Sequence, residues 1–197
     1  HALLMFVLEV FSGCGELTAA LKAAGFGVSA PMDAYPAKDI YVPEHALIRP
    51  SVVKHLEALF VAGCFFYVHF GLPCSSFSSL QHWNCGTRTQ SNPEGDCLLE
   101  REVTGNKLAK VTARLCRILH DAGCYFSIEN PLSSYVWNFL PILKLLEVAS
   151  DVKFDQCMYR LQPPHVLQVS ASTSHSKSNT LPCQSSKSHS KPIQFTY

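Results

Sequence analysis

Five short segments along the chain have the composition of buried β-strands. The first is continuously apolar apart from Glu9, and the third is rich in residues that favour β-strands. Apolar runs of this length are typical of parallel strands that are covered on both faces. The expected strands are Leu4–Phe11, Phe26–Met32, Cys64–Phe70, Cys124–Ile128 and Val152–Tyr159.

The segments between these strands carry apolar residues every three or four positions, which predicts helices. A glycine follows each of the first three and is a plausible helix end. The expected helices are Glu16–Ala24, Ser51–Ala62, Asn106–Ala122 and Ser133–Ala149. The last should form two short helices, because Pro141 interrupts it.

Strands that alternate with helices predict an α/β fold with a doubly wound, mostly parallel sheet. In such sheets, ligands bind beyond the C-terminal ends of the strands. The loops after Phe11, Met32, Phe70 and Ile128 should therefore border one crevice.

Charge and cysteine content exclude several classes of protein. The chain has 16 basic and 15 acidic residues. A basic footprint for tight non-specific DNA binding is therefore absent. Nine cysteines without a CxxC pair argue against a zinc site or a disulfide framework. We expect reduced thiols, no metal and an intracellular protein. The most apolar stretch, Ala58–Leu72, is short for a membrane span.

Three motifs follow predicted strands. FSGCG (11–15) is a glycine turn that lets backbone approach a ligand. GLPCSSFS (71–78) places Cys74 where a helix N-terminus lowers the pKa of a thiol. IENP (128–131) places Glu129 in the crevice, where burial would suit it to donate a proton. Taken singly, each has a plain structural explanation: a tight turn, an inert cysteine and a helix cap.

In this order, the three motifs resemble the glycine motif, the Pro-Cys loop and the Glu-Asn motif of the cytosine-5 DNA methyltransferases. The resemblance covers residues 4–160 and is nearest in style to short methyltransferase-like domains, some of them found in mobile elements. It implies a Rossmann-like class I methyltransferase fold. It also implies S-adenosyl-L-methionine as cofactor and DNA with a flipped cytosine as partner.

The resemblance also implies roles for single residues. Cys74 would attack C6 of cytosine, Glu129 would protonate N3, and Asn130 would hold the two loops in register. The cofactor-binding residues would be Phe11, Gly13, Gly15, Asp33, Leu72 and Pro73.

The chain departs from the family pattern in several places. Asp33 stands one residue after the usual ribose-binding Glu, Ala46 stands where an acid would read the adenine, and no separate target-recognition domain follows. Three alternatives therefore stay open: a catalytically degenerate domain of a mobile-element polyprotein, an amine acceptor, and RNA in place of DNA. A cysteine hydrolase would need a histidine beside Cys74, and neither His69 nor His82 is well placed by sequence.

The polar segment 81–105 would then be the cover over the target base. Arg88 and Arg101 would either touch phosphates or lie on an ordinary surface. Trp83 would either stack on a base or anchor the loop, and anchoring is favoured.

The expected domains are residues 1–166 as the methyltransferase-like domain, 167–190 as a disordered serine-rich insertion or tail, and 191–197 as a closing strand. Nine serines lie between Ser170 and Ser190. The location would be nuclear in a eukaryote.

Overall fold

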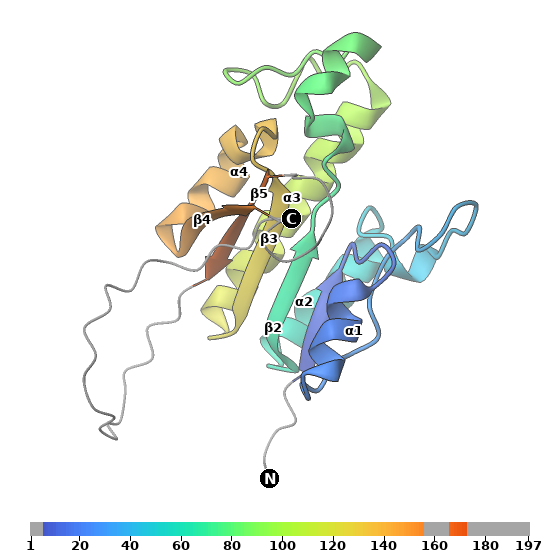
Figure 1. Cartoon of the computed structure of the whole chain (residues 1–197), viewed down its shortest axis with the longest axis vertical. Helices are drawn as coiled ribbons and strands as arrows, with labels where there is room; N and C mark the ends of the chain where they lie inside the picture. Colours follow the sequence, from blue (N-terminus) through green and yellow to red (C-terminus); the bar gives the residue numbers. More distant parts are fainter. Residues whose placement is uncertain (1–5, 156–165, 173–197) are drawn as a thin grey trace.

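The computed structural model describes residues 6–155 and 166–172, and they form an open five-stranded sheet in the order β1-β2-β3-β5-β4 (Figure 1). The first three strands are parallel, β5 is antiparallel to β3, and β4 is antiparallel to β5. The strands are β1 (Phe6–Val10), β2 (Phe65–Gly71), β3 (Tyr125–Pro131), β4 (Ala149–Asp155) and β5 (Val166–Ser172).

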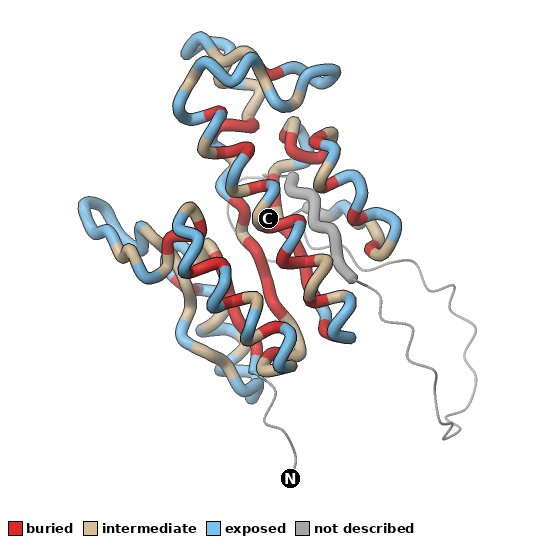
Figure 2. Tube along the Cα trace, turned by 180° about the vertical axis from the view of Figure 1, so that it is seen from behind, coloured by how far each residue is buried: buried red, intermediate tan, exposed pale blue. Residues whose placement is uncertain are grey.

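Helices cover both faces of the sheet. α1 (Glu16–Ala23) lies on the front face in Figure 1, and α2 (Pro50–Val61), α3 (Glu100–Asp121) and α4 (Leu140–Leu143) lie on the rear face, seen in Figure 2. The described short 3-10 turns are η1 (Pro43–His45), η2 (Ser75–Phe77), η3 (Ser79–Asn84), η4 (Tyr135–Asn138) and η5 (Lys144–Glu147). This Rossmann-like α/β arrangement confirms the predicted fold class.

The hydrophobic core lies between the sheet and the rear helices. Side chains of a strand alternate between faces. The alternate positions that point rearward, two from each parallel strand, are at most 2% exposed: Leu8, Val10, Val68, Phe70, Phe126 and Ile128. They pack with fully buried side chains of α2 and α3, such as Phe60 and Leu115. The rear face therefore supplies most of the apolar burial that stabilises the domain.

The predicted strand Phe26–Met32 is reduced to two isolated bridges to β1, at Val28 and Met32. Pro31 lies between them and has no N–H to donate, which interrupts a ladder. α3 begins six residues earlier than expected, so the polar segment before it is shorter than predicted.

Residues 167–172, expected to belong to the serine-rich insertion or tail, form most of β5. The domain boundary at residue 166 stays a prediction. Serine content suggested disorder, but Val166–Ser172 pairs with strands on both sides, and that pairing satisfies its backbone. Residues 191–197, expected to close the sheet, lie outside the described residues, as do residues 156–159 of the last predicted strand.

Within residues 6–155 and 166–172, the helices are all too short or too polar to cross a bilayer.

Candidate active site

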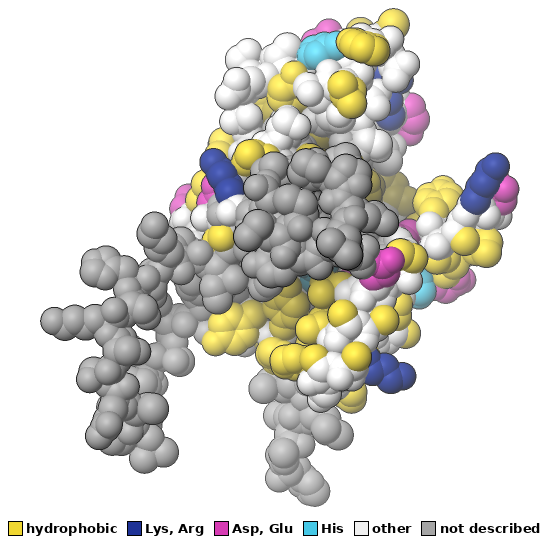
Figure 3. Space-filling view, in the orientation of Figure 1, with side chains coloured by type: hydrophobic (Ala, Val, Ile, Leu, Met, Phe, Trp, Pro, Cys, Tyr) yellow, Lys and Arg dark blue, Asp and Glu magenta, His cyan; other side chains and the backbone are white. Residues whose placement is uncertain are grey.

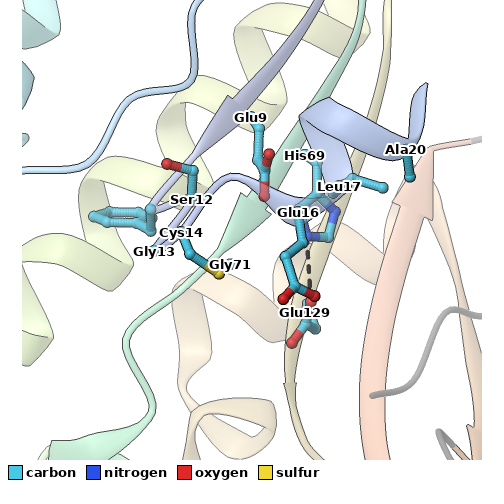
Figure 4. Close-up of a pocket in the computed structure, with 11 residues that line it drawn as sticks. Glu9, Ser12, Gly13, Cys14, Glu16, Leu17, Ala20, His69, Gly71 and Glu129 are labelled. Atoms are coloured by element: carbon cyan, nitrogen blue, oxygen red, sulfur yellow. Dashed lines mark hydrogen bonds and ion pairs between the residues drawn. The ribbon is translucent and has the colours of Figure 1, made fainter. Parts of the chain in front are cut away.

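The front face of the parallel strands is polar where the rear face is apolar. Glu9, His69 and Glu129 come from β1, β2 and β3 and contribute to one cavity of about 400 Å³ beneath α1 (Figure 4). The glycine loop 11–14 and the first turns of α1 form the rest of its wall, with Gly71 opposite. The cavity lies at the C-terminal end of β1, where the topology predicts a ligand.

The backbone of the loop after β1 turns sharply to make this wall. Phe11, Gly13 and Gly15 all have positive φ, of 58°, 53° and 72°. A side chain on Gly71 would place its Cβ 2.9 Å from the carbonyl oxygen of Phe11. The loop and the end of β2 therefore approach closely only because residue 71 is glycine.

Three carboxylates give the cavity a negative character. Glu9, Glu16 and Glu129 line it, and the described lining includes no lysine or arginine. Glu9 is held by Thr18, whose backbone N–H and hydroxyl both donate to Oε2, at 2.7 and 2.5 Å. The arrangement favours a ligand that carries positive charge. The part of the chain that the structure describes holds no cluster of three or more His, Cys, Asp or Glu suited to a metal ion.

Glu129 stands at the end of a line of polar side chains. Its Oε2 is 3.3 Å from Nε2 of His69, whose Nδ1 is 2.8 Å from Oγ of Ser127. Ser127 Oγ is also 2.6 Å from the hydroxyl of Tyr67. Burial raises the pKa of Tyr67 to about 12, with Glu129 and Glu9 adding to the rise while the Ser127 hydrogen bond opposes it. Tyr67 is therefore a protonated phenol at neutral pH.

Cys74 follows β2 and is half-buried at the start of η2. Burial raises the pKa of its thiol; a backbone hydrogen bond opposes the rise, and the charge of Glu129 adds to it. The lowered pKa expected from a helix N-terminus is therefore wrong. The reason is that η2 is only three residues long, so its dipole is small beside the cost of burying a thiolate.

Asn130 links the two segments that carry Cys74 and Glu129. Its Nδ2 donates to the carbonyl oxygen of Leu72 at 2.6 Å, and both residues are buried. On the other side, the indole N–H of Trp137 donates to the carbonyl of Pro131 at 2.8 Å. The ends of β2 and β3 are thus joined where the predicted nucleophile and acid are attached.

The predicted cofactor-binding residues fall into two groups in the structure. Phe11 and Gly13 line the cavity, and the other four do not. The Asp33 carboxylate accepts from the backbone N–H groups of Gly13 and Tyr35, both at 2.7 Å. Gly15 packs beneath Pro31, Leu72 is buried and Pro73 is exposed. These assignments stay predictions.

Sequence reasoning assigned no role in the site to eight of the eleven residues that line the cavity, among them Glu9, Glu16 and His69. Glu9 and His69 each had a signal, since each is a polar side chain inside an otherwise apolar strand. Buried polar groups of this kind need partners and so mark a site.

The segment between Cys74 and α3 is anchored by Arg88, which is only 2% exposed. Its guanidinium stacks over the ring of Phe77 at 3.8 Å and donates to Asn106 Oδ1 at 2.7 Å and to the Glu102 carbonyl at 2.9 Å. Arg88 is therefore not placed to touch phosphates. Trp83 is 89% exposed, so the favoured prediction that it anchors the loop is wrong, and Arg88 does so instead.

No protein-family model and no curated protein matches the chain. Among solved structures, it is similar to the methyltransferase EhMeth from Entamoeba histolytica, with a TM-score of 0.52 and 16% identity. The match covers 93% of this chain and 57% of the EhMeth chain, so this chain spans just over half of that protein. The likeness shows that the chain has the fold of that methyltransferase structure.

Proposed function

We propose that this domain transfers a methyl group from S-adenosyl-L-methionine to C5 of cytosine in DNA. The observation that carries the proposal is the hydrogen bond from Asn130 to Leu72, which ties the Cys74 segment to the strand end that bears Glu129. Glu129 in turn lines a cavity walled by a glycine loop. The fold shared with a methyltransferase structure supports the same chemistry.

The residues present fit the proposed cofactor. A cavity of about 400 Å³ lies in the range of small-molecule sites. The cofactor is a sulfonium cation, and three carboxylates line the cavity. Phe11, Gly13 and Glu16 would hold it, and when bound it supplies the methyl group for C5.

Cys74 provides the sulfur that attacks C6 of the base, which makes C5 nucleophilic. The thiol must first lose its proton, because burial holds its pKa above the ordinary value. Glu129 donates a proton to N3 and thereby neutralises the charge that the attack places on the ring. After methylation, water takes the proton from C5, the Cys74 sulfur leaves as a thiolate, and N3 returns its proton to Glu129.

The central test compares Cys74→Ser with Cys64→Ser, a control at the opposite end of β2. Both proteins are incubated with labelled cofactor and cytosine-containing duplex DNA, and methyl incorporation is counted. We expect Cys74→Ser to lose at least 10²-fold and the control to stay within about twofold, because a hydroxyl is a far weaker nucleophile than a thiolate. Equal activity of the two variants would remove Cys74 from the reaction.

A duplex containing 5-fluorocytosine tests the covalent step directly. Fluorine at C5 cannot leave as a proton, so the protein should stay joined to the DNA through Cys74 and migrate as a larger species on a denaturing gel. An amine-directed enzyme would form no such adduct. The same fluorinated base in RNA separates the two nucleic acids, and a folded protein that fails to bind the cofactor in a titration would be a degenerate domain.

A further inference from the structure

The line of polar side chains behind Glu129 connects two cavities. His69 lines both the cavity of Glu129 and a second one of about 250 Å³, which also contacts Tyr67, Leu21 and Phe26. The contacts between Tyr67, Ser127, His69 and Glu129 are 2.6, 2.8 and 3.3 Å. Figure 4 shows the last of these as a dashed line. At 3.3 Å it is long for a hydrogen bond, as is common in sites without substrate.

The chain of contacts has two complete hydrogen-bonding arrangements. When Glu129 is a carboxylate, Tyr67 donates to Ser127, Ser127 donates to Nδ1 of His69, and Nε2–H donates to Glu129. When Glu129 is protonated, every donor and acceptor is reversed, and His69 carries its proton on Nδ1. Both arrangements keep His69 neutral, and they differ by one proton delivered to Glu129.

We propose that Tyr67, Ser127 and His69 form a proton relay that supplies Glu129 with the proton it gives to N3 of the base, an inference that rests on the proposed function. Water gives a proton to the Tyr67 oxygen as Tyr67 passes its own to Ser127. Ser127 passes its proton to Nδ1 of His69, and Nε2 passes its proton to Glu129. Each relay atom gains and loses one proton.

The placement of Glu129 explains why it needs a source of protons other than the solvent in the cavity. Its side chain is 21% exposed and lines the cavity, so a bound base and cofactor would cover it. Tyr67 reaches the second cavity, which α1 separates from solvent only in part, since Phe26 at that cavity is 47% exposed. The charged groups that face His69 are Glu9 in register on β1, Glu129 on β3 and Glu16 on α1.

Three substitutions break the relay at different points. Tyr67→Phe removes the outer hydroxyl and Ser127→Ala removes the middle one. His69→Gln keeps an amide donor for Glu129 but loses the link to Ser127. The matched control is Tyr125→Phe, because Tyr125 pairs with Tyr67 in the sheet and is 44% exposed.

The measurement is the single-turnover rate of methyl transfer to a cytosine duplex between pH 6 and 8. We expect all three relay variants to lose about 10²-fold at pH 8 and distinctly less at pH 6. The loss grows with pH because Glu129 must then take its proton from bulk water before the base covers it. The control should stay within twofold, and cofactor affinity should not change in Tyr67→Phe or Ser127→Ala, because neither residue lines the cofactor cavity. A loss that is the same at every pH, or an active His69→Gln, would reduce His69 to a positioning residue and overturn the relay.

A second measurement needs no substrate and so separates failure of the relay from failure of the proposed function. Nitrogen NMR of the His69 ring should show the Nε2–H tautomer while Glu129 is a carboxylate and the Nδ1–H tautomer once Glu129 carries its proton. Ser127→Ala should abolish the switch, because Nδ1–H then lacks its acceptor. A ring that becomes doubly protonated in the wild-type protein, without changing tautomer, would refute the relay even if the enzyme methylates DNA.

Discussion

The two faces of the parallel strands differ sharply in what they do. On the rear face, Val68, Phe70 and Ile128 are fully buried against helices. On the front face, His69, Ser127 and Glu129 occupy the alternate positions of the same strands and contact one another. Adjacent residues of one strand therefore serve opposite purposes, stability on one face and chemistry on the other.

This contrast shows which face of the sheet can hold polar side chains. The front face is covered by α1, a helix of eight residues, and none of the residues of α1 is buried. Partial cover leaves room for a ligand and lets each polar side chain keep a partner. The rear face is closed by α2 and α3, so a polar group there would need a partner inside the protein.

The largest effect should come from the rear face. Phe70→Ala removes a fully buried ring and should lower the free energy of unfolding by about 3–5 kcal/mol, because the closed core cannot refill the space. Urea unfolding followed by circular dichroism measures the change. A loss below 1 kcal/mol would contradict the conclusion that the rear face supplies most of the apolar burial that stabilises the domain.

Asn130 is the polar exception on the rear face and should have the next largest effect. Asn130→Ala leaves the buried Leu72 carbonyl without its donor and should cost about 1–3 kcal/mol. Methyl transfer should fall by more than the stability loss explains, since the Cys74 segment loses its tie to β3. Unfolding and transfer assays on one preparation check both, and normal transfer would contradict the linking role of Asn130.

A smaller effect is expected on the front face at Glu9. Glu9→Gln keeps an acceptor for Thr18 but replaces charge-assisted hydrogen bonds by neutral ones, which should cost about 1 kcal/mol. Cofactor affinity should fall as well, because one of three carboxylates in the cavity is neutralised. Calorimetric titration measures that affinity, and an unchanged value would argue that Glu9 serves only to hold α1.

The stability of the segment before α3, which Arg88 anchors, should depend on pH in the acid range. Burial alone would raise the pKa of Glu102, but the hydrogen bonds from Thr87 and the charges of Arg88 and Arg101 outweigh it, so the pKa is lowered. The stabilisation is present above the ordinary glutamate pKa of about 4.3 and is lost as pH falls through the lowered value. Glu102→Gln should therefore be less stable than the wild type at pH 7, and the gap should close below about pH 4. Equal gaps at both pH values would contradict this.

The smallest effect is expected at Trp83. Because this side chain is 89% exposed, Trp83→Ala should change the free energy of unfolding by no more than about 0.5 kcal/mol. Arg88→Ala serves as the contrasting variant, since it removes the buried anchor of the same segment. Comparable losses of unfolding free energy in the two variants would mean that Trp83 also anchors the segment.

Much of the fold could be predicted because the signals are local. The apolar runs predicted three parallel strands to within three residues of their observed bounds, and helical spacing predicted α1 and α2 to within one residue. The spacing also predicted the body of α3, which begins six residues earlier than expected. Cys74, Glu129 and Asn130 were singled out because each follows a predicted strand. The near absence of the strand at 26–32 and the presence of β5 depend on pairing with distant strands, which periodicity does not report.

What the amino-acid sequence determined by itself is the α/β class and the order in which three motifs reach one edge of the sheet, because both follow from residue periods and from the geometry of parallel strands. Only the tertiary structure decided that Arg88 is a buried anchor, that burial raises the pKa of the Cys74 thiol, and that His69 meets a glutamate 60 positions away. Burial and hydrogen bonding between distant residues depend on which segments pack together, and that is a property of the folded chain as a whole.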